Sequence, residues 1–229
     1  ISKWNVGKLE DADSMFWQAK SFNRGIAEWD MSSVTSMLAM FAETTLFNQN
    51  LNAWDVSAVT NMGSLFWSAK GFNVGISNWD VSNVENMDSF FYSANFNKEI
   101  NGWELSSITS ATSMFYEAGA LNKNIEWEMG EITTLESFFY KAVTFNGDVS
   151  GWDTSRVTDL YSCFEEAYDF NSDINNWDVS AVTRMDYLFY YVAFNTPLNS
   201  WDTASLNTAM GTFELAGEFN QDISGWNTF

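Results

Sequence analysis

The sequence has no histidine, a single cysteine, and only 10 lysines and arginines against 30 aspartates and glutamates. The lack of histidine removes the commonest general base and metal ligand of enzymes. One cysteine excludes a disulfide framework and a thiolate metal cluster. Because nucleic acids and anionic membranes bind lysine and arginine footprints, neither is an expected partner. Cations and basic surfaces suit the formal net charge of −20.

Long hydrophobic runs and a signal peptide are also missing, so we expect no direct insertion into a membrane. The chain starts without Met on an expected strand, Ile1–Trp4, and stops on another, Trp226–Phe229. No polar capping coil is visible at either end, although repeat arrays need caps for solubility. We therefore expect a segment of a longer protein without its caps.

Tryptophan marks an internal repeat that runs through the whole chain. Ten tryptophans follow one another at intervals of 24 or 25 residues: Trp4, Trp29, Trp54, Trp79, Trp103, Trp127, Trp152, Trp177, Trp201 and Trp226. A fixed period in this range is typical of repeat architectures, in which each coil contacts only its neighbours. We expect residues 1–229 to form one continuous array of about nine coils.

The residues around each tryptophan predict a short strand. In the clearest copy, Ile76, Trp79 and Val81 have the spacing of leucine-rich repeats, in which alternate side chains of a strand point inward. We place a strand of about four or five residues there in every coil.

The second half of each repeat predicts a short helix. Met87, Phe90, Phe91 and Ala94 fall at positions i, i+3, i+4 and i+7, which is helical spacing. The expected fold is therefore an α/β solenoid similar to leucine-rich repeats, with one short parallel strand and one short helix in each coil of 24–25 residues.

A threonine column precedes the expected helices, where threonine is a favourable N-cap. Its members are Thr35, Thr60, Thr109, Thr133, Thr158 and Thr183. Glu136 and Asp186 follow Thr133 and Thr183 by three positions, as in a capping box. Regular threonine arrays can also bind ice, usually on a flat sheet face. Because these hydroxyls are expected at helix ends, ice binding is only a minor alternative.

An asparagine column lies in the return segment of each coil: Asn23, Asn48, Asn73, Asn97, Asn122, Asn146, Asn171, Asn195 and Asn220. Stacked return loops contain backbone amides and carbonyls that need partners, and asparagine offers both a donor and an acceptor. We interpret the column as a structural ladder and not as a binding site.

The repeat closely resembles a known family of surface proteins. The segments Phe72–Phe91 and Phe170–Met185 both carry the pattern Phe-Asn-x-x-Ile-x-x-Trp-Asp-Val-Ser-x-Val. This pattern is similar to the BspA-like leucine-rich repeats, also called DUF285 or the mycoplasma lipoprotein repeat. The resemblance covers essentially the whole chain. It implies a leucine-rich-repeat-like solenoid on a secreted or surface-anchored protein, often linked to adhesion, and carries over no catalytic residues.

Two departures from the pattern are local. Leu121 replaces the phenylalanine and one residue is lost between Ile125 and Trp127, while Ala94–Phe96 is one residue shorter than its counterparts. We expect irregular stacking in the coil around residues 115–130.

An acidic column follows the tryptophans and should point outward from the expected strand. It contains Asp30, Asp55, Asp80, Glu104, Glu128, Asp153, Asp178 and Asp202. Carboxylates on neighbouring coils would repel by about 1 kcal/mol in water. One hypothesis is a ladder of Ca²⁺ ions between coils. The alternative is that each carboxylate accepts hydrogen bonds from backbone amides or from the serine two residues on: Ser32, Ser57, Ser82, Ser106, Ser155 and Ser180.

An aromatic row lies at the margin of the expected helices: Trp17, Trp67, Tyr92, Tyr116, Tyr140 and Tyr190. Partly exposed rings of this kind stack against sugars or pack between subunits, and Trp and Tyr are enriched in interface hot spots. The alternative is that they shield the edge of the core. The row is the candidate interaction stripe.

Nothing in the sequence breaks the repeat to bring a nucleophile and a base together, so we predict that the protein is not an enzyme. Cys163 stands where most coils have Met, Leu or Phe, and is expected to be a small core residue. We predict an extracellular or cell-surface scaffold that mediates adhesion by binding a protein or glycan. The alternative is self-assembly as the structural subunit of an extracellular filament or coat.

Overall fold

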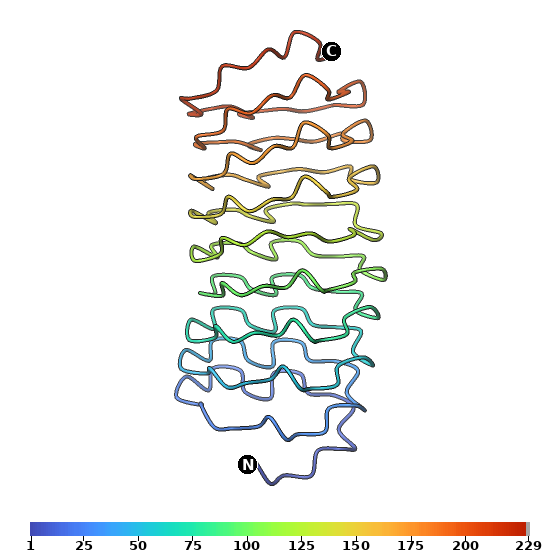
Figure 1. The fold of residues 1–229 in the computed structure, drawn as a ribbon, viewed down its shortest axis with the longest axis vertical. Helices are drawn as coiled ribbons and strands as arrows, with labels where there is room; N and C mark the ends of the chain where they lie inside the picture. Colours follow the sequence, from blue (N-terminus) through green and yellow to red (C-terminus); the bar gives the residue numbers. More distant parts are fainter. Residues whose placement is uncertain (228–229) are drawn as a thin grey trace.

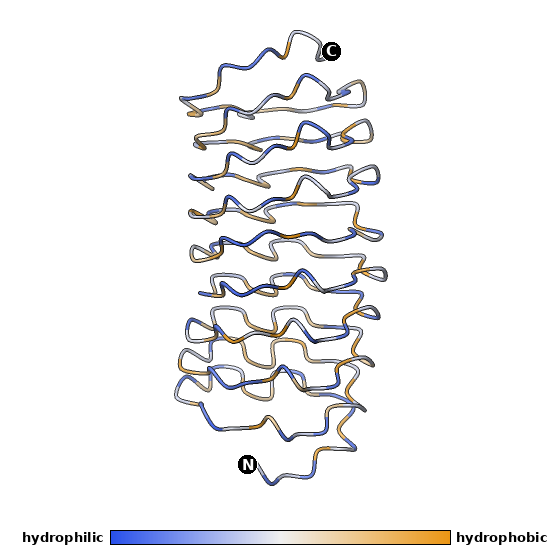
Figure 2. Cartoon of the chain, in the orientation of Figure 1, coloured by the Kyte–Doolittle hydropathy of each residue, from blue (hydrophilic) through white to orange (hydrophobic). Residues whose placement is uncertain are grey.

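The computed structural model describes residues 1–227. The chain winds through a row of stacked coils, with the N-terminus at one end of the row and the C-terminus at the other (Figure 1). Hydrophilic and hydrophobic segments alternate within every coil, so each coil contributes both to the interior and to the surface (Figure 2). The hydrophobic core is one continuous cluster that extends from Val6 to Leu206.

The predicted α/β architecture is wrong, because residues 1–227 form neither an α-helix nor an extended strand. Regular pairing is limited to isolated parallel bridges between neighbouring coils: Asp11–Ser36, Ser36–Asn61, Asn61–Asn86, Asn86–Ser110, Thr134–Asp159, Asp159–Arg184 and Arg184–Thr208. These bridges lie directly after the threonine column and not at the tryptophans. The predicted strand position is therefore wrong as well.

A run of tight turns occupies the place of the expected helix. From Met37 to Glu43, every second amide donates to a carbonyl of residues 61–67 in the next coil, at 2.7–3.0 Å. The amides of Met40, Ala42 and Thr44 donate instead to the third residue back, each at 3.1 Å. A helix would use these amides within its own coil. Sharing them between coils is what joins the array along its axis.

The turns place non-glycine residues in the left-handed region at intervals of four. Ala39 and Glu43 have φ angles of 54° and 57°, and Ser64 and Ser68 repeat the pattern at 54° and 51°. Such a conformation costs roughly 1–2 kcal/mol per non-glycine residue. The hydrogen bonds to the neighbouring coil offset this cost, because they hold the turn on both sides.

The hydrophobic positions are buried as predicted, although the element is not a helix. Met87, Phe90, Phe91 and Ala94 are all fully buried. Turns that repeat every four residues return positions i, i+4 and i+8 to one side of the chain, which resembles helical periodicity. Equivalent rings of neighbouring coils stack in this core, as Phe41 does on Phe66 with 5.7 Å between ring centroids.

Nine of the ten periodic tryptophans, all but Trp4, join their own coil to the preceding one. The buried indole of Trp54 donates from Nε1 to the carbonyl of Ile26 at 3.1 Å, and the same carbonyl accepts the backbone amide of Trp29 at 3.1 Å. The Ile-x-x-Trp segment is therefore a tight turn. The indole bond recurs at Trp29, Trp79, Trp103, Trp127, Trp152, Trp177, Trp201 and Trp226.

The asparagine column is a hydrogen-bond ladder. The backbone amide of Asn122 donates to Oδ1 of Asn97 at 3.0 Å, and the amide of Asn97 donates to Oδ1 of Asn73 at 2.9 Å. The same bond joins all the other neighbours from Asn23 to Asn220. The side-chain oxygen accepts every one of these bonds. The ladder therefore depends on asparagine as an acceptor, which is one of the two roles predicted for it.

We expect Asn97→Ala to lower the free energy of unfolding by about 1 kcal/mol, because the amide of Asn122 loses its acceptor. Asn97→Asp keeps a side-chain oxygen at the same place and should lose markedly less. Urea unfolding followed by tryptophan fluorescence measures both changes. Equal losses for the two variants would contradict an acceptor role.

Irregular stacking appears where the sequence predicts it. The isolated bridges pass from Asn86 to Ser110 and start again only at Thr134, so one bridge is missing, although the amides of Phe115 and Glu117 still donate to carbonyls of the next coil. Gly130 has a φ angle of 53°, and a Cβ atom there would lie 2.2 Å from the carbonyl oxygen of Leu105. Only glycine fits this close approach. The interior continues across the interruption, because Phe115 stacks on Phe139 at 5.6 Å.

Candidate functional site

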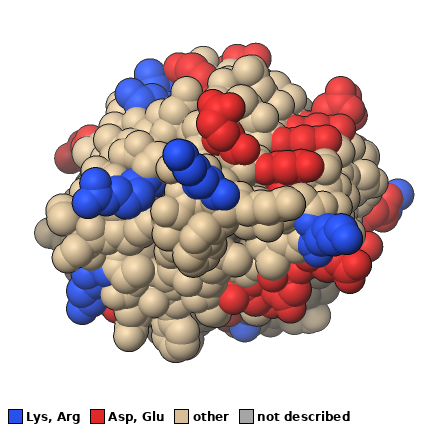
Figure 3. All heavy atoms as spheres, turned by 90° about the horizontal axis from the view of Figure 1, so that it is seen from below, with Lys and Arg blue, Asp and Glu red and all other residues tan. Residues whose placement is uncertain are grey.

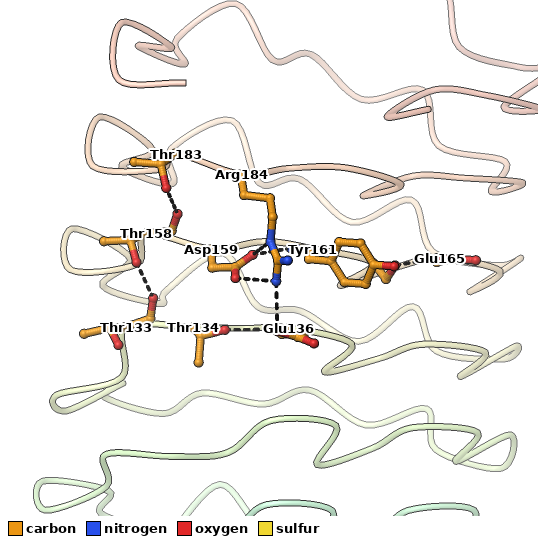
Figure 4. Close-up of polar contacts among 10 residues, drawn as sticks. Thr133, Thr134, Glu136, Thr158, Asp159, Tyr161, Glu165, Thr183 and Arg184 are labelled. Carbon is orange, nitrogen blue, oxygen red and sulfur yellow. Dashed lines mark hydrogen bonds and ion pairs between the residues drawn. The ribbon is translucent and has the colours of Figure 1, made fainter. Parts of the chain in front are cut away.

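The threonine column lies on the surface but caps no helix. The Oγ1 atoms of Thr158 and Thr183 donate to the carbonyls of Thr133 and Thr158 in the preceding coil, at 3.2 and 3.1 Å (Figure 4). The N-cap role is therefore wrong, because the hydroxyls bind between coils. Glu85 interrupts the column between Thr60 and Thr109. The charge of Glu85 breaks the regular threonine array, and the hydroxyls already donate within the protein. Neither feature favours ice binding.

The two predicted capping boxes are wrong for the same reason. Glu136 accepts a bond from Arg184 at 2.9 Å, and Arg184 also pairs with Asp159 at 2.6 Å and lies over the ring of Tyr161 (Figure 4). Arg184 thus connects three successive coils. Asp186 reaches the opposite neighbour, where it accepts the hydroxyl of Thr208 at 2.6 Å. Both clusters stabilise the stacking of coils.

The acidic column is exposed throughout, and five of the six predicted serines bond to their carboxylates, whereas Ser106 donates to the carbonyl of Ser82 at 3.4 Å. Oδ1 of Asp30 accepts the amide of Ser32 at 3.2 Å and its hydroxyl at 2.6 Å. The same pair of bonds recurs at Asp55, Asp80 and Asp178, and the amide bond alone at Asp153 and Asp202. The serine hydroxyl, followed by the amide, lowers the pKa of Asp30 and of Asp80.

The geometry gives little support to the Ca²⁺ ladder. Glu104, Glu126 and Glu128 are among the residues that line a hollow of about 430 Å³. Nevertheless, no three acidic or thiol groups within residues 1–227 come close enough to hold a metal ion. Calcium needs six to eight oxygen ligands, and most carboxylates of this column are already bonded to their own coil.

Four members of the candidate interaction stripe form one continuous row. Tyr116 stacks on Tyr92 and on Tyr140, with 4.3 Å between ring centroids on each side. Trp67 extends the row, 5.9 Å from Tyr92 and tilted by 48°, and Lys141 closes the other end 5.1 Å from the centre of Tyr140. All four rings are half-buried. The row therefore covers the edge of the core, and part of each ring remains exposed to solvent.

The row alters the acidity of its own hydroxyl groups. Burial is the largest cause that raises the pKa of Tyr92 to about 12, and the neighbouring Tyr116 contributes next. Burial also raises the pKa of Tyr116. These two hydroxyl groups stay protonated across the physiological pH range.

The other two predicted members lie apart from this row. Trp17 is 54% exposed, and its indole reaches Oε1 of Glu43 at 3.4 Å. Tyr190 meets Tyr187 edge to face at 5.9 Å. Ala42 separates Trp17 from Trp67 in the column, and Glu165 separates Tyr140 from Tyr190. The stripe is thus continuous only from Trp67 to Tyr140.

The sequence matches a protein-family model described as a Mycoplasma protein of unknown function, DUF285, over residues 1–95, 50–150 and 123–226. The chain belongs to the DUF285 family. No curated protein and no solved structure matches it. The family match supports the DUF285 part of the resemblance. The leucine-rich-repeat part is not confirmed, because residues 1–227 of this DUF285 chain lack the strand and the helix of that repeat.

The charged side chains of the array are unevenly distributed over its N-terminal end (Figure 3). Seen from its N-terminal end, the DUF285 chain carries carboxylates mostly toward one side of the view, with broad uncharged areas elsewhere (Figure 3). Among the described residues, no helix has the length and apolar character needed to cross a membrane. Cys163 is fully buried, and burial raises the pKa of its thiol well above the usual range, as expected of a core residue.

One surface feature was missed in the sequence. Tyr168 and Tyr191 are 39% and 52% exposed and line a hollow of about 370 Å³ near the C-terminal end. The signal for it in the sequence is a change in repeat length: one residue separates Val192 from Phe194, where two separate Ala167 from Phe170.

Proposed function

We propose that this DUF285 chain is a rigid repeat scaffold of an extracellular or cell-surface protein, and that it binds a protein partner through the row from Trp67 to Tyr140. The observation that carries the proposal is the stack of half-buried rings at 4.3 Å spacing. Tyr and Trp are enriched in interface hot spots, where they contribute large contact area at low entropic cost. The resemblance to BspA-like surface repeats supports the same location.

The ring faces of the row are largely covered, which favours a protein ligand over a glycan. Both faces of Tyr116 are covered by its neighbours, and Lys141 covers the outer face of Tyr140. Sugars stack against open ring faces, whereas here mainly edges and hydroxyl groups remain for a partner. Edges and hydroxyls suit a protein surface that offers hydrogen-bond acceptors and apolar side chains.

A binding role also agrees with the burial of the thiol and the hydrogen bonding of the carboxylates. The single thiol is buried, and most carboxylates of the acidic column bond to serine or backbone within their own coil. A fixed array of this kind presents the same groups repeatedly along its length. We infer a scaffold that gains affinity by engaging several coils at once.

The test compares binding to a panel of purified extracellular proteins and glycans by biolayer interferometry. The triple variant Tyr92→Ser, Tyr116→Ser, Tyr140→Ser should lose on the order of tenfold or more in affinity for a protein ligand. The matching Tyr→Phe triple variant keeps the stack but loses the hydroxyl groups, so its affinity should lie between those of the Tyr→Ser variant and the unchanged protein. Thermal unfolding of each variant shows whether it is folded.

A control triple variant changes a different column: Thr109→Ser, Thr133→Ser and Thr158→Ser. It should bind like the unchanged protein. Binding to glycans alone, or full binding by the Tyr→Ser variant, would contradict the proposal. Concentration-dependent self-association that the Tyr→Ser variant abolishes would support the alternative of a filament or coat subunit.

A further inference from the structure

The hollow near the C-terminal end results from one short coil between two longer ones. Two residues, Tyr168 and Asp169, separate Ala167 from Phe170, and two residues again precede Phe219 in the coil after next. The coil between them has only Ala193 before Phe194. Its amide donates to the carbonyl of Tyr168 at 3.3 Å, as the amide of Asp169 does to the carbonyl of Val143 in the preceding coil, so the short return stays joined to its neighbour.

The walls of the hollow are aromatic and aliphatic, and they are open to solvent. Tyr168 and Tyr191 meet edge to face, with 5.2 Å between centroids and 75° between the ring planes. Leu215, 59% exposed, forms a further wall, and Glu218 brings a carboxylate to the rim. The volume of about 370 Å³ lies within the range of small-molecule sites.

The electrostatics of the hollow favour a cation. The hydroxyl of Tyr168 donates to Oε2 of Glu166 at 3.0 Å, and this bond increases the electron density of the ring. The same bond is the largest cause that raises the pKa of Tyr168. Lys141 neutralises only part of Glu166, through its other oxygen at 3.4 Å. Electron-rich ring faces attract organic cations.

The same shortening occurs in another coil, where different residues fill the space. Asn95 stands where Ala193 does and donates from Nδ2 to the carbonyl of Lys70 at 3.0 Å. Lys70 stands in the place of Tyr168, and its Nζ donates to the hydroxyl of Ser93 at 2.8 Å. The protein thus places its own cation and amide there. At Ala193 the corresponding space is left between two tyrosines.

We propose that the hollow around Tyr168 and Tyr191 binds an organic cation of the quaternary ammonium class, such as a trimethylammonium group. Two rings at 75° form a corner that surrounds a compact cation, whereas a sugar needs one flat face. Within the described residues no three carboxylates converge on a metal site, so an organic cation fits better than a metal ion. This site does not depend on the aromatic row from Trp67 to Tyr140.

The experiment titrates the intact chain with choline and with its neutral isostere 3,3-dimethylbutan-1-ol, by calorimetry and by NMR of the ligand methyl groups. Choline should bind about tenfold more tightly than the isostere, because only choline carries the charge. Tyr191→Leu should remove this preference. The triple variant Tyr168→Lys, Tyr191→Ser and Ala193→Asn reproduces the residues of the filled coil and should abolish choline binding.

Trp17→Leu removes an equally exposed ring from the other end of the chain and should bind choline like the unchanged protein. Tyr168→Phe keeps the ring, loses the bond to Glu166, and should bind a few-fold more weakly. Equal binding of the isostere, preferential binding of methyl glucoside, no binding of choline, or full binding by a folded Tyr191→Leu variant would each overturn the proposal.

Discussion

Trp79→Ala should lower the free energy of unfolding by roughly 3–5 kcal/mol, the cost of removing a buried aromatic side chain and leaving a cavity. Trp79 is 2% exposed, and its indole contributes a bond to the carbonyl of Leu51 at 2.9 Å. Its ring also packs against Phe66 at 6.3 Å. Removing it therefore weakens its own coil and the preceding one together.

Chemical unfolding followed by circular dichroism measures this loss. Trp79→Phe should lose less, because a ring remains in the core and mainly the bond to Leu51 is removed. Trp17→Ala, at a ring that is 54% exposed, is the control and should change stability little. A loss below about 1 kcal/mol for Trp79→Ala would be incompatible with a buried tryptophan column.

Burial could be predicted from the sequence because it depends on position within the repeat. Met87, Phe90 and Phe91 are interior residues whichever backbone carries them. The same holds for the asparagine column, since a side-chain oxygen at one point of every coil meets the amide of the next. Period and residue type were sufficient for these conclusions.

The backbone path could not be predicted from the same pattern. Apolar residues at i, i+3, i+4 and i+7 fit a helix and equally fit turns that repeat every four residues. The difference lies in where the amides donate, and periodicity carries no information about that. The recurring serine at positions such as Ser64 and Ser89 is a signal in the sequence, because both residues adopt a positive φ.

Some features of the candidate sites could also be predicted from the sequence, and others could not. The bonds from Ser32 and Ser57 to their aspartates are local, over two residues, and were foreseen as the alternative to a metal ladder. The continuity of the aromatic row from Trp67 to Tyr140 followed from the column itself. The hollow at Tyr168 was missed because it depends on three successive coils of unequal length, which only their stacking brings together.

The interrupted coil offers the second large effect. Gly130→Ala should cost roughly 2–4 kcal/mol, because the new Cβ would lie 2.2 Å from the carbonyl oxygen of Leu105 and 3.2 Å from Cγ2 of Ile108. The carbonyl of Leu105 accepts the amide of Ile108 at 3.2 Å, so it cannot move away without loss of that bond. Urea unfolding and the near-ultraviolet spectrum of the tryptophans measure the change.

Comparison with other positions separates steric overlap from backbone strain. Ala39 has a φ of 54°, nearly that of Gly130, so an alanine is compatible with this conformation in the array. At Gly151 a Cβ atom would meet no other atom within 4 Å, and Gly151→Ala should be neutral or stabilising by up to about 1 kcal/mol. If Gly130→Ala were as mild as Gly151→Ala, the close approach to Leu105 would not be what fixes glycine there. A large loss confined to Gly130→Ala would mean that the irregular coil depends on a backbone contact that no side chain can replace.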